Sequence, residues 1–176
     1  RATLIEALSD EHLGVRLEAI KALRNHEMDG TPLAAILRGP DRALHAGAAD
    51  ALGGMLGEDV TPALIEALSS AYTTITRRKA ARSLAKQRDV RGVGPLLNTI
   101  GDPNPNMRVA SARALSQLVG HLNYSDLGRA SESLGTGLHH PNPTVQLHAA
   151  YNLGMLGKPE GAAILAEALT NVEPAL

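Results

Sequence analysis

A repeat of about thirty residues constrains this chain more than any other feature of its sequence. One set of apolar positions is spaced by 29, 31, 32, 38 and 31 residues: Leu8, Leu37, Leu68, Ile100, Leu138 and Leu169. A second set is spaced by 29, 32, 31 and 38 residues: Leu23, Leu52, Leu84, Leu115 and Leu153. Both sets give the same period and the same single long step. The sequence therefore predicts an array of similar units, none of which buries its apolar face alone.

The residues from Val93 to Gly120 show what one unit contains. A short helix is expected to end at Ile100, and residues 101–106 (GDPNPN) then form a sharp corner. The two prolines of this corner cannot continue the first helix, and either asparagine can cap the second. The second helix carries its apolar and small residues at helical spacing, at Met107, Ser111, Ala112, Ala114, Leu115 and Leu118. One unit is therefore expected to be a short helix followed by a longer one.

The fold class that this pattern predicts is all-α, a right-handed α-solenoid of stacked antiparallel helix pairs with about 5.5 repeats in a single array. The units are placed approximately at residues 1–30, 31–59, 60–89, 90–122 and 123–157, with a half unit at 158–176. The other helices, about eleven in all, are expected at 2–9, 12–24, 32–38, 42–56, 61–70, 72–86, 125–139, 145–156 and 159–170. Gly47, Gly53 and Gly54 lie inside one of them, which is therefore expected to be locally soft or closely approached by a neighbour.

Composition agrees with thin helical layers. The chain has no Phe, Trp or Cys and only three Tyr, so it has neither the aromatic bulk of a thick globular core nor thiols for disulfides or thiolate metal sites. Its net charge of -1 gives no global attraction to nucleic acid or to a membrane. No apolar run reaches the length of a membrane span, and we expect a cytoplasmic location. Because the chain starts at Arg1 rather than Met, we interpret it as processed or as part of a longer protein.

Several segments resemble the HEAT-repeat family, and specifically its short HEAT-like class known from phycobilin lyases and from many bacterial and archaeal scaffolds. The resemblance covers essentially the whole chain. It is carried by LIEAL at 4–8 and 64–68, by Gly101-Asp102-Pro103 with Met107-Arg108, and by the Ala-x-x-Leu-Gly endings at 49–53 and 150–154. The resemblance implies the solenoid fold and a role as a binding surface.

The resemblance also implies a ladder between repeats, made by an Asp at the corner and an Arg early in the long helix. The Asp positions match at Asp10, Asp41 and Asp102, and the Arg positions match at Arg16, Arg77 and Arg108. The ladder is expected to be broken in units two, three and five, where other residues occupy these positions: His45, Ser70, His140 and Gln146.

No catalytic constellation is present in the sequence, and we expect no enzymatic activity, no cofactor and no metal. HEAT-like deoxyhypusine hydroxylases hold two irons with His-Glu pairs on their long helices, but here His45 and His148 are each followed by Ala. His26-Glu27 is the one such pair, and it is expected in a loop. A metal site needs several converging ligands, so the histidines are interpreted as packing or solvent-facing residues.

The distribution of charge stands out from this background. From Arg77 to Arg113 the chain has nine basic and two acidic residues, a local +7, whereas the remaining residues sum to -8. Aligning the long helices on their leucines places Lys21, Asp50, Arg82, Arg113 and Tyr151 in one row, and Lys79 and His148 in a neighbouring row. In HEAT-like arrays the second helices line the inner surface. The residues predicted to bind a partner there are Arg78, Lys79, Arg82, Arg113, Tyr151 and Lys21.

The favoured function is a protein-protein interaction scaffold or adaptor that binds a partner with an acidic segment on its concave face. The alternative interpretation of the cations is a solvated helix face together with ladder arginines. A second function that the resemblance permits is a phycobilin-lyase-like subunit that handles a linear tetrapyrrole. Nucleic acid is disfavoured, because that mode needs a more extended basic lining and aromatic side chains. The sequence gives no oligomeric state.

Overall fold

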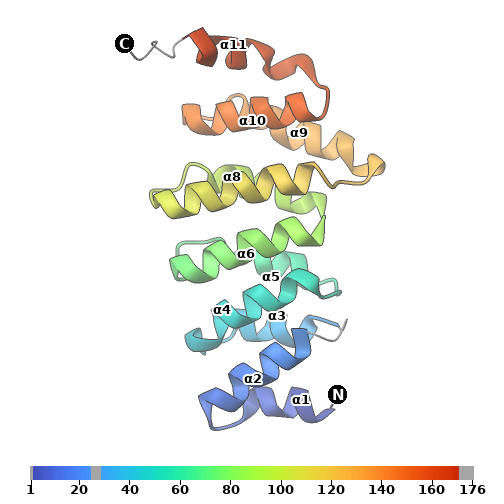
Figure 1. Cartoon of the computed structure of the whole chain (residues 1–176), viewed down its shortest axis with the longest axis vertical. Coiled ribbons are helices and arrows are strands. Elements are labelled where there is room, and N and C mark those ends of the chain that lie inside the picture. Colours follow the sequence, from blue (N-terminus) through green and yellow to red (C-terminus); the bar gives the residue numbers. More distant parts are fainter. Residues whose placement is uncertain (1, 25–28, 171–176) are drawn as a thin grey trace. The chain divides into compact units, whose positions relative to one another are not determined.

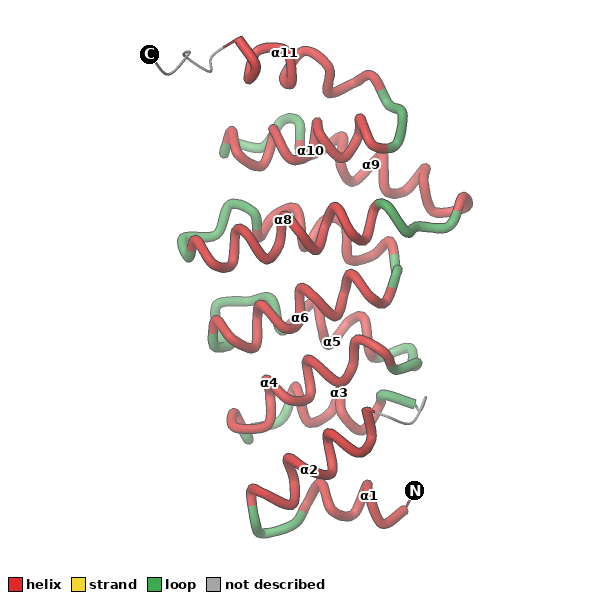
Figure 2. Tube along the Cα trace, viewed as in Figure 1, coloured by secondary structure: helices red, strands yellow, loops and turns green. Residues whose placement is uncertain are grey.

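The structure, a computed structural model, describes residues 2–24 and 29–170. Within these ranges the chain forms eleven α-helices and short 3-10 turns, with no strand beyond one isolated bridge between Asp29 and Leu56 (Figure 2). The expected all-α repeat fold of stacked helix pairs is confirmed. The chain divides into two compact units, Arg1–Gln87 and Arg88–Leu176, which are called here the N-terminal and C-terminal units. The single array over the whole chain stays a prediction.

The N-terminal unit contains three helix pairs: α1 (Ala2–Glu6) with α2 (Leu13–Arg24), α3 (Thr31–Arg38) with α4 (Arg42–Ala51), and α5 (Val60–Glu66) with α6 (Thr74–Gln87). The long helices α2, α4 and α6 lie side by side in one layer, and α3 and α5 lie behind it (Figure 1). Both expected leucine columns are buried between the layers in this unit: Leu8, Leu37, Leu68, Leu23, Leu52 and Leu84. The repeat period therefore corresponds to one helix pair.

The C-terminal unit contains α7 (Val93–Thr99), α8 (Pro105–Val119), α9 (Leu127–Gly137), α10 (Pro143–Met155) and α11 (Ala162–Thr170). Ile100, Leu115 and Leu153 are buried here, as the leucine columns predict. Two column residues depart from this pattern: Leu138 is only half-buried, and Leu169 has 76% of its surface exposed because no helix of the described residues follows α11 and covers it.

The helix starts follow the capping signals of the sequence. The Asn104 side chain accepts from the backbone amides of Asn106 and Met107 at 2.9 and 3.4 Å, and Asn142 accepts from Thr144 at 2.9 Å. Asp41 caps α4 in the same way, by accepting from Ala43 at 3.1 Å. In each case a side-chain oxygen satisfies an amide that the first helical turn leaves without a partner.

The helix predicted at residues 42–56 is shorter in the structure. Helix α4 ends at Ala51, and a 3-10 turn follows at Leu52–Gly54. The Gln87 side chain donates to the carbonyls of Leu52 and Met55 at 2.6 and 2.9 Å, so an element distant in sequence holds the chain out of the helix. At Gly53 a Cβ would lie 2.7 Å from the Ser83 hydroxyl, so the expected close approach is confirmed at this glycine.

The third corner, 69–73, also shifts two helix ends relative to the prediction. Helix α5 ends at Glu66 rather than at Ser70, and α6 begins at Thr74 rather than near Tyr72. Between them the amides of Ser69 and Tyr72 bond in successive turns to the carbonyls of Glu66 and Ser69. This corner lacks the Gly and Pro of the other corners, so the sequence carries little signal for its bounds.

No helix within residues 2–24 and 29–170 combines the length and the hydropathy that crossing a bilayer requires.

Candidate partner-binding surfaces

The early position of each long helix, where the ladder arginine was expected, is engaged with the corner that precedes it. Four side chains donate or bond to the carbonyl six residues earlier: Arg16 to Asp10 (2.6 Å), His45 to Gly39 (2.7 Å), Arg108 to Asp102 (3.1 Å) and Gln146 to His140 (2.7 Å). Arg77 reaches the Leu68 carbonyl at 2.7 Å. Arginine, histidine and glutamine therefore perform the same structural task at this position.

One rung of the expected ladder between repeats is confirmed. Arg16 pairs with Asp41 of the next helix pair at 3.1 Å, while its other nitrogen holds its own corner. His45, which occupies the arginine position in unit two, contacts the ring of Tyr72 at 5.2 Å between centroids. His45 is buried in this position, as expected for a packing histidine.

Helix α6 presents four cations on one face. They occupy positions i, i+1, i+4 and i+8, which lie within an arc of about 100° on a helix. We call this set the α6 basic face: Arg78, Lys79, Arg82 and Lys86. Lys79 is half-buried and the other three are exposed. Their side chains form no hydrogen bond or ion pair with any described residue of the chain, so their charge is available to a partner.

The rest of the expected row in the N-terminal unit is already neutralised. Lys21 on α2 pairs with Glu18 at 2.6 Å, and Arg24 pairs with Asp50 on α4 at 3.1 Å. Helix α4 packs against both α2 and α6, so it separates Lys21 from the α6 basic face. Lys21 therefore contributes less to a basic surface than the sequence alignment of the helices indicates.

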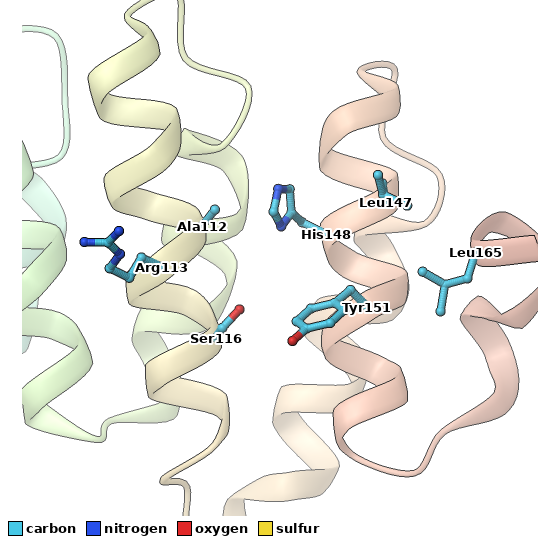
Figure 3. A pocket seen from close by; sticks show the side chains of 7 residues that line it. All are labelled: Ala112, Arg113, Ser116, Leu147, His148, Tyr151 and Leu165. Atoms are coloured by element: carbon cyan, nitrogen blue, oxygen red, sulfur yellow. The ribbon is translucent and has the colours of Figure 1, made fainter. Parts of the chain in front are cut away.

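In the C-terminal unit a pocket of about 530 Å³ opens between α8, α10 and α11 (Figure 3). We call it the α8–α10 pocket, and its lining residues are Ala112, Arg113, Ser116, Leu147, His148, Tyr151 and Leu165. Figure 3 shows the Ala112 and Ser116 side chains extending from α8 toward α10, and those of His148 and Tyr151 extending from α10 toward α8. Its volume is in the range of small-molecule and side-chain pockets.

The electrostatics of this pocket are set by two side chains. Arg113 is exposed, forms no ion pair with a described residue, and directs its guanidinium away from the space between Ser116 and Tyr151 (Figure 3). Burial lowers the pKa of His148 below its ordinary value of 6.5, because the imidazolium is poorly solvated there. At neutral pH the pocket wall is therefore mostly uncharged, with one cation at its rim.

The predicted binding residues thus divide between the two units. Arg78, Lys79 and Arg82 lie together on α6, Lys21 lies apart on α2, and Arg113 and Tyr151 line one pocket. A continuous surface that joins Arg82 to Arg113 stays a prediction. Sequence reasoning missed Leu147 and Leu165 as pocket residues. A signal for Leu147 was present in the sequence, because it is an apolar residue at a position of the long helix that faces outward. In the structure 37% of its surface is exposed.

From the sequence, the histidines are considered as possible metal ligands and interpreted as packing or solvent-facing residues. In the described residues no group of three or more His, Cys, Asp or Glu side chains is arranged to hold a metal ion. His148 belongs to the α8–α10 pocket, and the pair His26-Glu27 lies outside the described residues.

Comparison with protein families identifies a repeat family. The model of the HEAT repeats family matches residues 61–127 and 95–175. A comparison with curated proteins gave no match.

Solved structures with a similar fold include several helical repeat proteins. The complex of CpcE and CpcF of phycocyanin lyase from Nostoc sp. PCC7120 has a TM-score of 0.61 at 24% identity, covering 97% of this chain and 70% of that chain. Human deoxyhypusine hydroxylase has a TM-score of 0.59 at 19% identity, covering 97% and 78%. A designed armadillo repeat protein in complex with a (KR)4 peptide has a TM-score of 0.58 at 12% identity, covering 97% and 92%. At these identities the likeness concerns the fold.

Proposed function

Because the chain belongs to the HEAT-repeat family, we propose that it is a protein-binding scaffold that recognises an acidic segment of its partner through the α6 basic face. The family and fold are typical of interaction scaffolds, and a designed armadillo repeat protein of similar fold holds a charged peptide. Here the α6 basic face carries the same positive sign as that peptide, so the expected partner segment is instead rich in Asp and Glu.

The observation that carries this proposal is the unpaired charge on one helix face. Three other cations of the N-terminal unit, Lys21, Arg24 and Arg38, have acidic partners at short distance. The α6 basic face keeps its charge free of such partners among the described residues, next to Ile75, which has 62% of its surface exposed. An apolar residue beside cations suits a peptide that contributes both carboxylates and some apolar contact.

A protein segment fits this face better than nucleic acid does. Proteins that bind single-stranded nucleic acids stack the bases on aromatic side chains. This chain has three Tyr and no Phe or Trp, so it has few side chains for such stacking. Sustained phosphate binding also needs a longer basic track than one helix face.

The test is a binding titration with a fluorescein-labelled peptide of alternating Glu and Gly. Arg82→Glu combined with Lys79→Glu should weaken binding by at least about tenfold, because two attractive pairs become repulsive. Binding to the unaltered chain should also weaken as salt rises, because these charges are solvent-exposed.

Lys158→Glu is the matched control for the single α6 variant Arg82→Glu, because Lys158 is an exposed cation of the C-terminal unit and its reversal makes the same change in net charge without touching α6. Equal loss in this control and in the α6 variant would show that only net charge matters and would contradict the proposal. Tighter binding of duplex or single-stranded DNA than of the acidic peptide at the same salt concentration would replace the acidic segment with nucleic acid.

A further inference from the structure

We propose that the α8–α10 pocket is a second binding site, which takes a bulky apolar side chain of a partner peptide and pairs an adjacent carboxylate of that peptide with Arg113. This site lies in the C-terminal unit, so it does not require the α6 basic face. Either surface can bind while the other does not.

The interior of the pocket selects an apolar group. Ala112, Leu147 and Leu165 supply aliphatic surface from three helices, and the Tyr151 ring forms one wall. Half of the Tyr151 surface and more than a third of the Leu147 surface are exposed, at 51% and 37%. Removing this apolar surface from water by inserting a leucine or an aromatic side chain is favourable.

The rim of the pocket selects the charge next to that group. The Arg113 stem lines the pocket, but its guanidinium points away from the interior in Figure 3. A carboxylate buried deep in the pocket would therefore miss this cation, whereas a carboxylate on the neighbouring residue of a peptide would lie over the α8 side of the rim. Because Arg113 has no acidic partner among the described residues, it can form such a charge-assisted hydrogen bond without breaking another.

The polar groups inside the pocket suit a peptide backbone. The Ser116 hydroxyl and the Tyr151 hydroxyl are directed toward the same space from opposite helices (Figure 3). Each can donate to a carbonyl and accept from an amide, so a peptide entering between α8 and α10 keeps its hydrogen bonds. Tyr and Arg are also the residue types that most often dominate the energetics of protein interfaces.

The experiment uses the whole chain and three short labelled peptides. The first has two adjacent leucines between aspartates, the second replaces the leucines with serines, and the third replaces the aspartates with asparagines. The first peptide should bind at least about tenfold more tightly than either of the others, since it alone supplies both groups. NMR signals of the His148 ring should shift on its addition, because His148 lines the pocket.

Two variants locate the binding. Ser116→Leu fills the pocket and should abolish the advantage of the leucines, and Arg113→Gln should abolish the advantage of the aspartates. Lys158→Gln is the matched control for charge, because this exposed cation is not a pocket residue and should leave both advantages intact. If Ser116→Leu does not fold, as judged by circular dichroism, Tyr151→Ala replaces it, since half of that side chain is already in solvent.

Equal affinity for the three peptides, or unchanged affinity in the pocket variants, would overturn the proposal. It would also be overturned if a linear tetrapyrrole shifted the His148 signals while the peptides did not, which would identify a small-molecule site. The double charge reversal on α6 should leave leucine dependence intact, so failure of the α6 proposal is distinguishable from failure of this one.

Discussion

The early position of each long helix tolerates different residues because each of them can donate a hydrogen bond to a backbone carbonyl of the preceding corner. Arg16, His45, Arg108 and Gln146 differ in charge and size, yet each bonds the carbonyl six residues earlier. A family pattern that requires arginine at this position therefore describes a frequent solution rather than a physical requirement. The corner bond is thus kept at His45 and Gln146, where the sequence predicts that the arginine rung between repeats is broken.

Gln146 allows this to be measured. Gln146→Leu removes the donor to the His140 carbonyl and should lower the free energy of unfolding by about 1 kcal/mol. Gln146→Arg keeps a donor of similar reach and should change it by less than about half of that. Urea denaturation followed by circular dichroism measures both, and equal losses in the two variants would show that the hydrogen bond is not what stabilises the corner.

The Arg38–Glu66 pair gives a pH-dependent contribution to stability. Arg38 donates to both carboxylate oxygens of Glu66, at 2.8 and 2.9 Å, and these bonds lower the pKa of Glu66 below its ordinary value of 4.5. The stabilisation is therefore present above pH 4.5 and is lost as pH falls through the lower, folded-state pKa. The Arg38 side chain is 34% exposed and the Glu66 side chain is 53% exposed. Solvent therefore screens the pair, and its contribution to stability is small.

Glu66→Gln should accordingly cost less than about 1 kcal/mol at neutral pH, and the difference from the unaltered chain should shrink on acidification. Glu58→Gln is the control, since Glu58 is exposed and has no ion-pair partner among the described residues. Denaturation midpoints measured across pH give both curves. If the stability difference between Glu66→Gln and the unaltered chain stayed constant into the acid range, protonation of Glu66 would not be the cause of the pH dependence.

At the scale of the helix, the capped starts of α8 and α10 were predictable from the sequence, whereas the start of α6 and several helix ends were not. The caps at Asn104 and Asn142 act on amides two or three residues away, so local sequence carries the signal. The end of α4 depends on Gln87, thirty-five residues from Leu52, and no local pattern reveals that bond. Similarly, the row alignment identified Arg113 and Tyr151, but the pocket between them depends on how α8, α10 and α11 pack.

Helix α9 contains two glycines whose surroundings differ. At Gly137 a Cβ would lie 2.4 Å from Leu97 and 2.9 Å from Ala149, whereas at Gly135 nothing lies within 4 Å. Gly137→Ala should therefore destabilise the chain by about 1–3 kcal/mol through overpacking. Gly135→Ala should leave stability unchanged or raise it by up to about 1 kcal/mol through helix propensity.

The comparison of these two variants is internally controlled, because both place the same methyl group on the same helix. Thermal or urea unfolding of each gives the sign directly. Equal effects at the two positions would mean that α9 adjusts its position to accept the added methyl group.

For the molecule as a whole, the leucine columns predicted the repeated helix pair, and the family match agrees with it. Neither column contains information about the partner, because buried leucines are shared by all such arrays. Binding resides in the outward residues, and there the chain offers two unlike surfaces in two units: cations on α6 and an apolar pocket between α8 and α10. The alignment of the long helices placed Arg82, Arg113 and Tyr151 in one row. It therefore did not distinguish the α6 basic face from the α8–α10 pocket.

The corner bonds have a consequence for how such a chain can change over time. Since each long helix is held near its start through a main-chain carbonyl, the solvent-facing positions of a long helix can be replaced without breaking this attachment. New binding specificities can then arise in one helix pair at a time, by substitutions of its solvent-facing residues, while the packing between the helix pairs stays the same.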